Sequence, residues 1–375
     1  MSGWQFANQG KIYIIDGTEW RRLVPKNWLL RGSKGGAGTY ESAGPRMSRN
    51  MVDEIGFNIG VYAATNVGRV RSGNEDNFLV LNLSTADTWT SLTVEGPAPD
   101  NLVSFKQGHY GTVLAVTDGM GGALAGEVAS RFAVESVRDR MLELQASPAY
   151  SKYAFPERLR LAIELANMHI HYESLTHEEY AGMGATFTAV GIHGDVAYFA
   201  QVGDSRAYMI RNDSVRQITR DQSLVSQLVE SGHITEAEAE QHTYKNVILQ
   251  ALGASAQISV AVNKVSLCDG DVLVLCSDGL SNKVRGEEMM QIVGRSATPA
   301  EACDAMIDLA NERGGEDNIT VMIARVADGG LEKADAAGDS KDVSWNIETV
   351  PRDPDLPHEV DPALVGSEDD TLSPP

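Results

Sequence analysis

The sequence predicts an α+β domain, with β-sheets stacked as a sandwich and covered by helices. Two observations lead to this prediction. Short apolar runs of strand length alternate with two long segments whose apolar residues recur at helical spacing, and later runs of strand length follow one another closely. With 42% hydrophobic and 22% charged residues, the chain of 375 residues has ample apolar content for a full core.

Three strands are expected in the first part of the chain. The apolar runs at residues 60–64, 77–83 and 112–117 have the length and composition of strands. Residues 84–109 separate the last two runs and are mostly polar. We therefore expect them to form a long surface loop.

Two long helices should follow these strands. Residues 125–144 carry Val128, Phe132, Val137 and Met141 at helical spacing, which predicts an amphipathic helix. Pro156 has the residue type favoured at the first helical position, so we expect it to open the second helix.

The second half of the chain is rich in strands. The runs at residues 187–192, 196–202 and 206–210 are predicted to form a meander of adjacent antiparallel strands. Further strands are expected at residues 271–275 and 319–326. Between these two, Thr298-Pro-Ala-Glu301 fits the start of a helix with a capping box.

Charge divides the chain into three parts. Residues 1–55 have a net charge of +3, residues 56–327 of −14 and residues 328–375 of −10. The last part is rich in Asp, Pro, Ala and Gly without apolar periodicity, so we expect a disordered acidic tail. The first part is expected to be a partly flexible extension with a short strand at residues 11–15, and its glycine-rich stretch at residues 32–38 to be a linker. The middle part is the predicted domain.

Composition excludes several classes of protein. A net charge of −21 disfavours nucleic acid and anionic membranes as partners, because both bind basic surfaces. No apolar run is long enough for a membrane span, and the N-terminus lacks the pattern of a secretory signal. The three cysteines have no CxxC spacing, which disfavours a structural zinc site and a disulfide framework. We therefore expect a cytoplasmic protein.

Acidic residues stand where several apolar strands meet a glycine or a turn. Any one of these positions alone is most simply an ordinary turn. If the strand ends converge, however, unpaired carboxylates would gather at a large electrostatic cost that bound cations would relieve. The residues concerned are Glu75, Asp76, Asp118, Asp204, Asp278 and Asp317.

The type of ligand indicates the metal. Carboxylates without cysteine or histidine suit hard cations such as Mg²⁺ or Mn²⁺ rather than zinc. Gly119 would let its backbone carbonyl approach a cation. Two such cations could share a water, lower its pKa and present it to a phosphorus atom. Arg71 has the planar, permanently charged fork that suits phosphate oxygens.

Taken together, the motifs resemble those of the metal-dependent protein phosphatases of the 2C type over about residues 58–327. The order and approximate spacing of the motifs match that family, and Asp118-Gly-Met-Gly-Gly is similar to its bacterial branch. The other matching motifs are Arg71-x-x-x-Glu75-Asp76, Gly182-Met-Gly-Ala-Thr186, Val202-Gly-Asp-Ser-Arg-Ala-Tyr208, Ser277-Asp-Gly-Leu280 and Asp317-Asn-Ile-Thr320.

The resemblance implies a fold and a role for each acidic residue. The fold is a central β-sandwich of two antiparallel sheets flanked by α-helices, with two Mn²⁺ or Mg²⁺ ions at one end. Asp118 would bridge the ions and the Gly119 carbonyl would bind one of them. The remaining roles are ligation by Asp278 and Asp317, water-mediated ligation by Glu75 and Asp76, a third, weaker site at Asp204, and substrate phosphate binding by Arg71.

The resemblance also implies a flap at about residues 218–253, beside the active site, that affects substrate choice. Animal relatives carry a histidine where this chain has Met120, whose thioether cannot donate a proton, so the general acid is unassigned. His233 and His242 in the flap are general-acid candidates, although solvated histidines without a chemical role are the simpler interpretation.

Three functions remain open from the sequence. The first is hydrolysis of phosphoserine and phosphothreonine on proteins, by a monomer that opposes a Ser/Thr kinase. The second is a regulatory protein that binds phosphoproteins without turnover, which the intact acidic set disfavours. The third is a phosphatase of small molecules.

Overall fold

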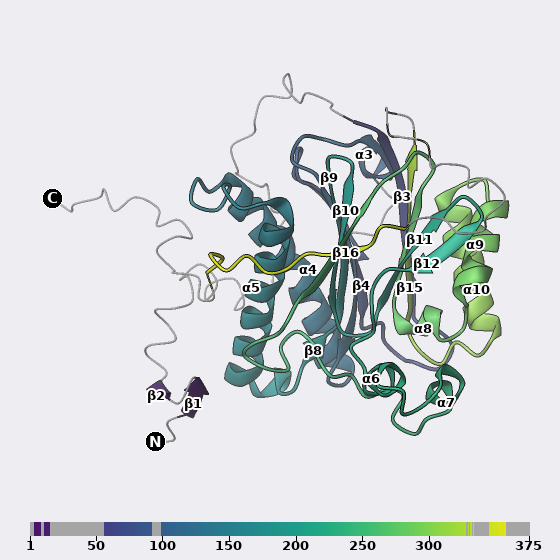
Figure 1. Cartoon of the computed structure of the whole chain (residues 1–375). Coiled ribbons are helices and arrows are strands. Elements are labelled where there is room, and N and C mark those ends of the chain that lie inside the picture. The colour runs from purple at the N-terminus through teal and green to yellow at the C-terminus, as the bar shows by residue number, and fades with distance from the viewer. Residues whose placement is uncertain are drawn as a thin grey trace.

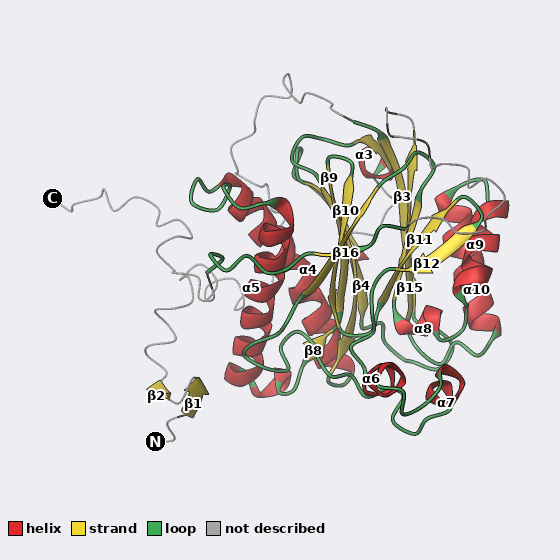
Figure 2. Ribbon diagram, viewed as in Figure 1, coloured by secondary structure: helices red, strands yellow, loops and turns green. Residues whose placement is uncertain are grey.

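Two antiparallel β-sheets stacked face to face form the centre of the molecule, with helices on both outer sides (Figure 1; Figure 2). The structure is a computed structural model that describes residues 4–8, 11–15, 56–91, 99–327, 329, 331, 333 and 345–357. The predicted α+β sandwich is therefore confirmed.

Eight strands of the described residues form the first sheet, in the order β16-β13-β10-β9-β7-β4-β5, with β8 added at the end of β7. Their bounds are β4 (Asp76–Asn82), β5 (Asp87–Thr90), β7 (Thr112–Met120), β8 (Gly184–Ala185), β9 (Phe187–His193), β10 (Val196–Val202), β13 (Ala261–Ser266) and β16 (Glu348–Thr349).

The second sheet has the order β12-β11-β14-β15-β3-β6. Its strands are β3 (Asn58–Asn66), β6 (Ser104–Lys106), β11 (Arg206–Arg211), β12 (Ser214–Gln217), β14 (Val272–Cys276) and β15 (Ile319–Ala327).

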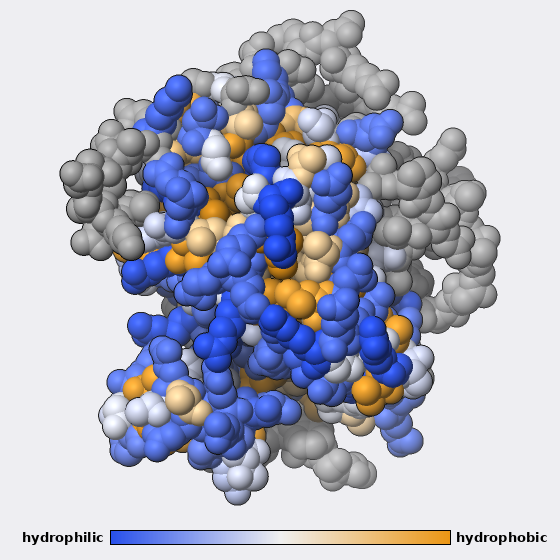
Figure 3. Space-filling model, turned by 90° about the vertical axis from the view of Figure 1, so that its right-hand side faces the viewer, coloured by the Kyte–Doolittle hydropathy of each residue, from blue (hydrophilic) through white to orange (hydrophobic). Residues whose placement is uncertain are grey.

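Helices α4 (Ala123–Ala146) and α5 (Phe155–Thr176) cover the first sheet, and α9 (Gly286–Arg295) and α10 (Pro299–Glu312) cover the second. The surface on the side of α9 and α10 is mostly hydrophilic, with only small hydrophobic groups (Figure 3). At the start of α10 the Thr298 hydroxyl accepts the Glu301 N–H at 3.2 Å. The Glu301 carboxylate, however, accepts the N–H of Ala297 rather than that of Thr298, so the predicted capping box is only half formed.

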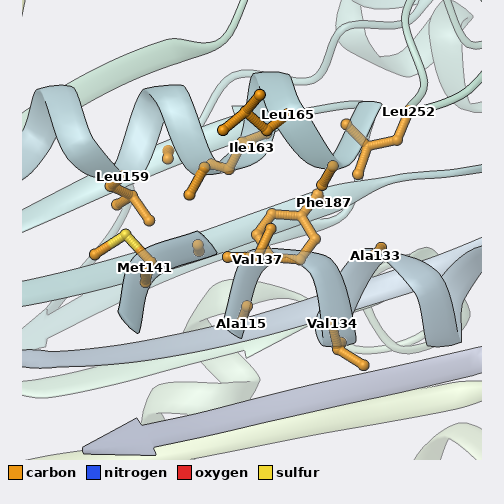
Figure 4. Close-up of a cluster of buried hydrophobic side chains, with 14 of the residues drawn as sticks. Ala115, Ala133, Val134, Val137, Met141, Leu159, Ile163, Leu165, Phe187 and Leu252 are labelled. Carbon is orange, nitrogen blue, oxygen red and sulfur yellow. The ribbon is translucent and has the colours of Figure 1, made fainter. Parts of the chain in front are cut away.

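Apolar side chains fill three layers: between α4/α5 and the first sheet, between the two sheets, and between the second sheet and α9/α10. Because side chains alternate along a strand, β4 sends Leu79 and Leu81 to the helix side and Phe78 and Val80 between the sheets. Figure 4 shows Phe187 of β9 among side chains of α4 and α5.

The predicted meander of residues 187–210 is wrong in its last step. Strands β9 and β10 pair as predicted, but β11 belongs to the other sheet. Strand β10 already has β9 and β13 on its two edges, and β11 needs cover on both faces. Ala207 and Met209 of β11 pack between the sheets, whereas Tyr208 and Ile210 pack toward α9 and α10. The chain therefore crosses from sheet to sheet at residues 203–205.

The prediction that residues 84–109 form a surface loop is also wrong in part. It contains β5, the short helix α3 (Asp100–Val103) and β6. Trp89 and Leu102 are almost fully buried, and Trp89 packs edge-on against Phe78 with 5.2 Å between ring centroids. Two anchoring side chains in a polar stretch leave no periodicity to recognise, which is why the sequence indicated a loop.

Part of the predicted disordered tail lies on the domain. We call residues 345–357 the strap: β16 within it pairs with β13 at the edge of the first sheet. The Arg160 guanidinium on α5 donates to the carbonyls of Val260 and Val350 at 2.6 and 2.7 Å. Arg352 pairs with Glu164 at 2.9 Å. Local composition did not predict this order, because the partners of the strap lie far away in sequence.

In the N-terminal part, the predicted strand β2 (Lys11–Ile15) is confirmed and pairs with β1 (Trp4–Asn8). The glycine-rich residues 32–38 and most of the predicted extension lie outside the described residues. None of the helices in the described part of the chain has an apolar stretch long enough to cross a bilayer.

The strap should contribute measurably to stability. Leu356 is 1% exposed in the layer beneath α5, so Leu356→Ala should lower the free energy of unfolding by about 2–4 kcal/mol in urea denaturation. The control is Leu175→Ala on the same helix layer, where 57% of the side chain is exposed, with an expected change within about 0.5 kcal/mol. Equal effects of the two substitutions would show that the strap is not packed in solution.

Candidate functional site

The acidic residues gather at one end of the sandwich, where β8 and the helices α6 (Leu224–Glu230) and α8 (Asp278–Ser281) are found (Figure 1). Antiparallel pairing explains this arrangement. Asp118 lies near the end of β7, directly opposite Asp76, the first residue of β4. Asp278 follows β14 and Asp317 precedes β15, its neighbour in the other sheet. Asp204 lies in the crossing between the sheets.

Burial and mutual repulsion act on these carboxylates. Burial raises the pKa of Asp118 well above its ordinary value, and the charges of Asp76, Asp278, Asp204 and Asp317 raise it further. Burial raises the pKa of Asp76 to about 7, and likewise that of Asp204 to about 7. Burial and the charge of Asp317 also raise the pKa of the Asp278 carboxyl. We call these five aspartates the acidic cluster.

Hydroxyl groups behind the cluster fix two of its members. The Ser277 hydroxyl donates to Oδ2 of Asp76 at 2.7 Å and accepts the N–H of Thr320 at 3.0 Å. The Thr186 hydroxyl accepts the N–H of Asp118 at 3.0 Å. The positions of Asp76 and Asp118 therefore depend on side chains that are themselves fully buried.

Gly119 lies where three backbone segments meet. A Cβ atom at this position would come within 2.0 Å of the Gly126 carbonyl oxygen and 2.8 Å of the Glu75 carbonyl oxygen. Glycine is therefore required for packing, in addition to the access to its carbonyl that the sequence suggested. Glu75 lies over the start of α4, because a Cβ at Gly126 would come within 2.6 Å of its Oε2. Burial raises the pKa of the Glu75 carboxyl.

Arg71 stands at the rim of the cluster. Its Nη2 donates to Oδ2 of Asp317 at 2.9 Å, and about half of its side chain is exposed. The charge of Asp317 raises the pKa of the guanidinium. A permanently charged fork at the open side of a buried acidic cluster is well placed to receive an anion.

A second arginine lies beneath the cluster and was not singled out in the sequence. Arg206, partly buried at the start of β11, donates to both carboxylate oxygens of Asp221, from Nε at 3.1 and 2.9 Å and from Nη2 at 2.7 Å. Its charge partly offsets the repulsion at Asp204 and Asp278. The motif that carries Asp204 also contains Arg206, but only the fold shows which way the guanidinium is paired.

The donor set fits hard divalent cations. Among the residues that the structure describes, Oδ1 of Asp76 and Oδ1 of Asp278 are buried without a hydrogen-bond partner. Such oxygens are costly unless a proton or a cation satisfies them. No three acidic, cysteine or histidine side chains in the described ranges already surround one point closely enough to hold an ion. Mg²⁺ and Mn²⁺ commonly take waters as part of their coordination shell, so the carboxylates need not form a closed cage.

The segment predicted as a flap projects beside the cluster and contains α6 and α7 (Glu236–Glu240). A bridge between Ala185 and Leu252 joins its end to β8. His233 is exposed and lies 2.6 Å from the Ser231 hydroxyl. Met120 is half-buried opposite Gly184 at the end of β7, and its side chain has no proton to donate.

Comparison with known proteins shows that this chain is similar to protein phosphatases. The family model described as protein phosphatase 2C matches residues 93–312. The serine/threonine phosphatase stp of Listeria innocua is 35% identical over 259 residues, which cover 69% of this chain and 92% of that protein. The protein phosphatase PhpP of Streptococcus pneumoniae is 36% identical over 212 residues, covering 56% and 85%.

Solved structures agree with these similarities. The serine/threonine phosphatase Stp1 from Staphylococcus aureus has a TM-score of 0.61 at 28% identity, and the match covers 75% of this chain and all of that one. The catalytic domain of the phosphatase PstP in complex with two manganese ions has a TM-score of 0.57 at 29% identity, covering 72% of this chain and all of that one.

The raised pKa values have a consequence for the metal-free protein. A carboxyl group with a pKa near 7 in the folded state and near 4 in the unfolded state stabilises the fold below pH 4, and this contribution is lost as the pH rises through 7. After treatment with EDTA, the free energy of unfolding should therefore fall by at least about 2 kcal/mol between pH 5 and pH 8.

Urea denaturation across this pH range measures the effect. Saturating Mn²⁺ should abolish most of the fall, because a cation favours the ionised carboxylates. Asp204→Asn should make the pH dependence of the metal-free protein shallower, because an amide does not titrate. A metal-free protein that is equally stable at pH 5 and pH 8 would contradict the repulsion inferred for the cluster.

Proposed function

This chain belongs to the protein phosphatase 2C family and is a metal-dependent serine/threonine protein phosphatase, and we propose that the acidic cluster is its catalytic centre. One observation carries the proposal. Five aspartates from both sheets gather at one end of the sandwich, four of them deep in the site and Asp317 at its rim, where their charges repel and two of their oxygens have no partner among the described residues. Cations supply what this arrangement lacks.

We assign the metal ligands as follows. Asp118 would be the ligand shared by both ions, because it lies near the end of β7 and the charges of all four other aspartates act on it. The Gly119 carbonyl would contribute to one metal site, and Asp278 and Asp317 to the other. Two Mn²⁺ or Mg²⁺ ions bound there would lower the pKa of a water molecule and offset the charge of the phosphoryl group.

The remaining acidic residues have supporting roles in this proposal. Asp76 and Glu75 would hold the metal ions through water, and the Ser277 hydroxyl, which donates to Oδ2 of Asp76, would orient Asp76 for this role. Asp204 provides a third, weaker site together with Asp278, which is close enough to raise its pKa. The guanidinium of Arg206, which pairs with Asp221, is close enough to Asp204 for its charge to lower the pKa of that carboxyl group.

Arg71 binds the substrate phosphate. In the absence of substrate its guanidinium makes a single hydrogen bond to Asp317, and an incoming phosphate can accept two hydrogen bonds from the guanidinium and carries more charge. Its exposed position at the rim lets a phosphorylated side chain reach it from solvent. Because Met120 has no proton to donate, protonation of the leaving alkoxide must come from another group.

Phosphorylated proteins are the proposed substrates, supplied by a Ser/Thr kinase, and we propose that the enzyme acts as a monomer. The flap beside the site exposes Tyr244, Val247 and Leu249, whose exposed fractions of 57%, 40% and 48% suit contact with a polypeptide better than with a small phosphate ester. All three cysteines are free, which supports a reducing compartment such as the cytoplasm.

Activity should depend on both the cation and the cluster. With Mn²⁺ the protein should hydrolyse p-nitrophenyl phosphate and a phosphothreonine peptide, and EDTA should abolish both activities. Asp278→Ala should lower kcat/KM at least about 100-fold, because it removes a ligand of the proposed metal site. The matched control is Asp195→Ala, an exposed aspartate in the turn at the opposite end of β10, with activity unchanged.

Other outcomes of this assay identify the competing functions. Hydrolysis that survives EDTA would exclude the metal mechanism. Mn²⁺ binding without turnover would favour a regulatory protein that only binds phosphoproteins. A preference for small phosphate esters over the peptide would favour a small-molecule phosphatase.

Substitution of Arg71 tests the phosphate-binding role separately. Arg71→Ala should raise KM for the phosphopeptide about tenfold, and Arg71→Lys should have an intermediate effect because it keeps the charge but loses the fork. Steady-state kinetics at saturating Mn²⁺ measure both. Unchanged KM in Arg71→Ala would exclude this arginine from phosphate binding.

A further inference from the structure

The side chain of Asn318 joins the two ends of the loop that presents Arg71. Its amide nitrogen donates to the carbonyls of Val67 and Gly73, each at 2.9 Å. Its amide oxygen accepts the N–H of Glu75 at 2.8 Å. The orientation of the amide is unambiguous, because two partners are carbonyl oxygens that can only accept and the third is an N–H that can only donate.

All hydrogen-bonding groups of this amide are engaged by one loop. Both N–H donors and the oxygen are used on residues 67–75, and Asn318 is 4% exposed. A buried amide with three well-formed hydrogen bonds is held rigidly, and removing it leaves two carbonyls and an N–H without their partner. These three hydrogen bonds therefore hold the two ends of the loop together.

The tip of the same loop has little else to hold it. Val70 is 68% exposed and the Arg71 side chain about half exposed. Before the tip, the Arg69 N–H donates to the Gly315 carbonyl at 2.7 Å, and Gly68 adopts a φ of +79° where a Cβ would come within 2.2 Å of the Asp317 carbonyl oxygen. At the tip itself, Arg71 forms an ion pair with Asp317. A bound cation would compete for the carboxylate of Asp317, and a bound phosphate for the guanidinium of Arg71.

Asn318 is itself fixed to the acidic cluster through the backbone. It follows Asp317 directly, and its N–H donates to Oδ1 of Asp317 at 2.9 Å. It also precedes β15, whose residues Ile319 and Thr320 are fully buried. The base of the Arg71 loop is thus tied to the same point of the chain that carries a proposed metal ligand.

We propose that Asn318 is a positioning residue for substrate binding, which holds the loop of residues 67–75 closed so that Arg71 stays over the acidic cluster. This proposal rests on the proposed role of Arg71 in binding phosphate. Without the hydrogen bonds of Asn318 the loop samples other conformations, and Arg71 is placed to bind the phosphate in only a fraction of them. Substrate affinity falls while the acidic cluster itself remains complete.

A double-mutant cycle on the full chain with saturating Mn²⁺ tests the proposal. Asn318→Ala should raise KM for a phosphothreonine peptide at least about fivefold with kcat within about threefold. In the Arg71→Ala background the same substitution should change KM less than about twofold, because the contribution that it positions is already absent. Asn318→Asp should not restore KM, because it replaces both N–H donors by an acceptor.

A matched control separates positioning from general destabilisation. Gln107 is 1% exposed and its amide is also hydrogen-bonded, donating to the Ile192 carbonyl and accepting from the Thr112 hydroxyl, at the opposite end of β7. Gln107→Ala should lower stability without raising KM. If Asn318→Ala does not fold, Asn318→Ser provides the same cycle. Amide hydrogen exchange of residues 67–75 should be faster in either Asn318 variant and unchanged in Gln107→Ala.

The possible failures are distinguishable. An equal rise in KM with and without Arg71 would overturn the positioning role, as would a loss of activity explained entirely by a higher Mn²⁺ requirement. Unchanged kinetics in Asn318→Ala beside a clear effect of Arg71→Ala would also overturn it. No effect of Arg71→Ala itself would instead reject the proposed phosphate-binding role on which the inference rests.

Discussion

Repulsion between buried carboxylates is the constraint on which this site depends. The antiparallel pairing that joins β4 to β7 and β14 to β15 places Asp76, Asp118, Asp278 and Asp317 at one end of the sandwich. Burial makes the charges of Asp76, Asp118 and Asp278 costly and raises the pKa of each carboxyl group. Divalent cations would offset this repulsion. The free energy of folding of this region is therefore coupled to cation binding.

The rest of the architecture supports that concentration of charge. Three apolar layers hold the sheets in register, so the ends of strands from both sheets stay together. The crossing from β10 to β11 brings Asp204 between the sheets, where the charge of Arg206, paired with Asp221, offsets part of the repulsion. Asn318 then connects the cluster to the loop of Arg71. The proposed metal ligands and the proposed phosphate-binding arginine are in this way connected through neighbouring positions of the chain.

Local signals in the sequence predicted the elements well and their partners less well. The strands β4, β7 and β15 and the helices α4 and α5 were predicted because their apolar periodicity is local. The crossing to β11 was missed because strand pairing depends on which edges are already occupied. The strap and Trp89 were missed because a few anchoring side chains fix them against distant segments. The acidic residues were found as strand ends, whereas the roles of Asn318 and Arg206 depend on contacts that no spacing indicates.

The central claim is that the acidic cluster holds divalent cations between the ends of the two sheets. X-ray diffraction from crystals grown with Mn²⁺, recorded at the manganese absorption edge, locates such ions directly. The account predicts two strong anomalous peaks bordered by Asp118, with Asp278 and Asp317 on one of them, and a weaker third peak near Asp204. Peaks elsewhere on the molecule with none among these carboxylates would contradict it.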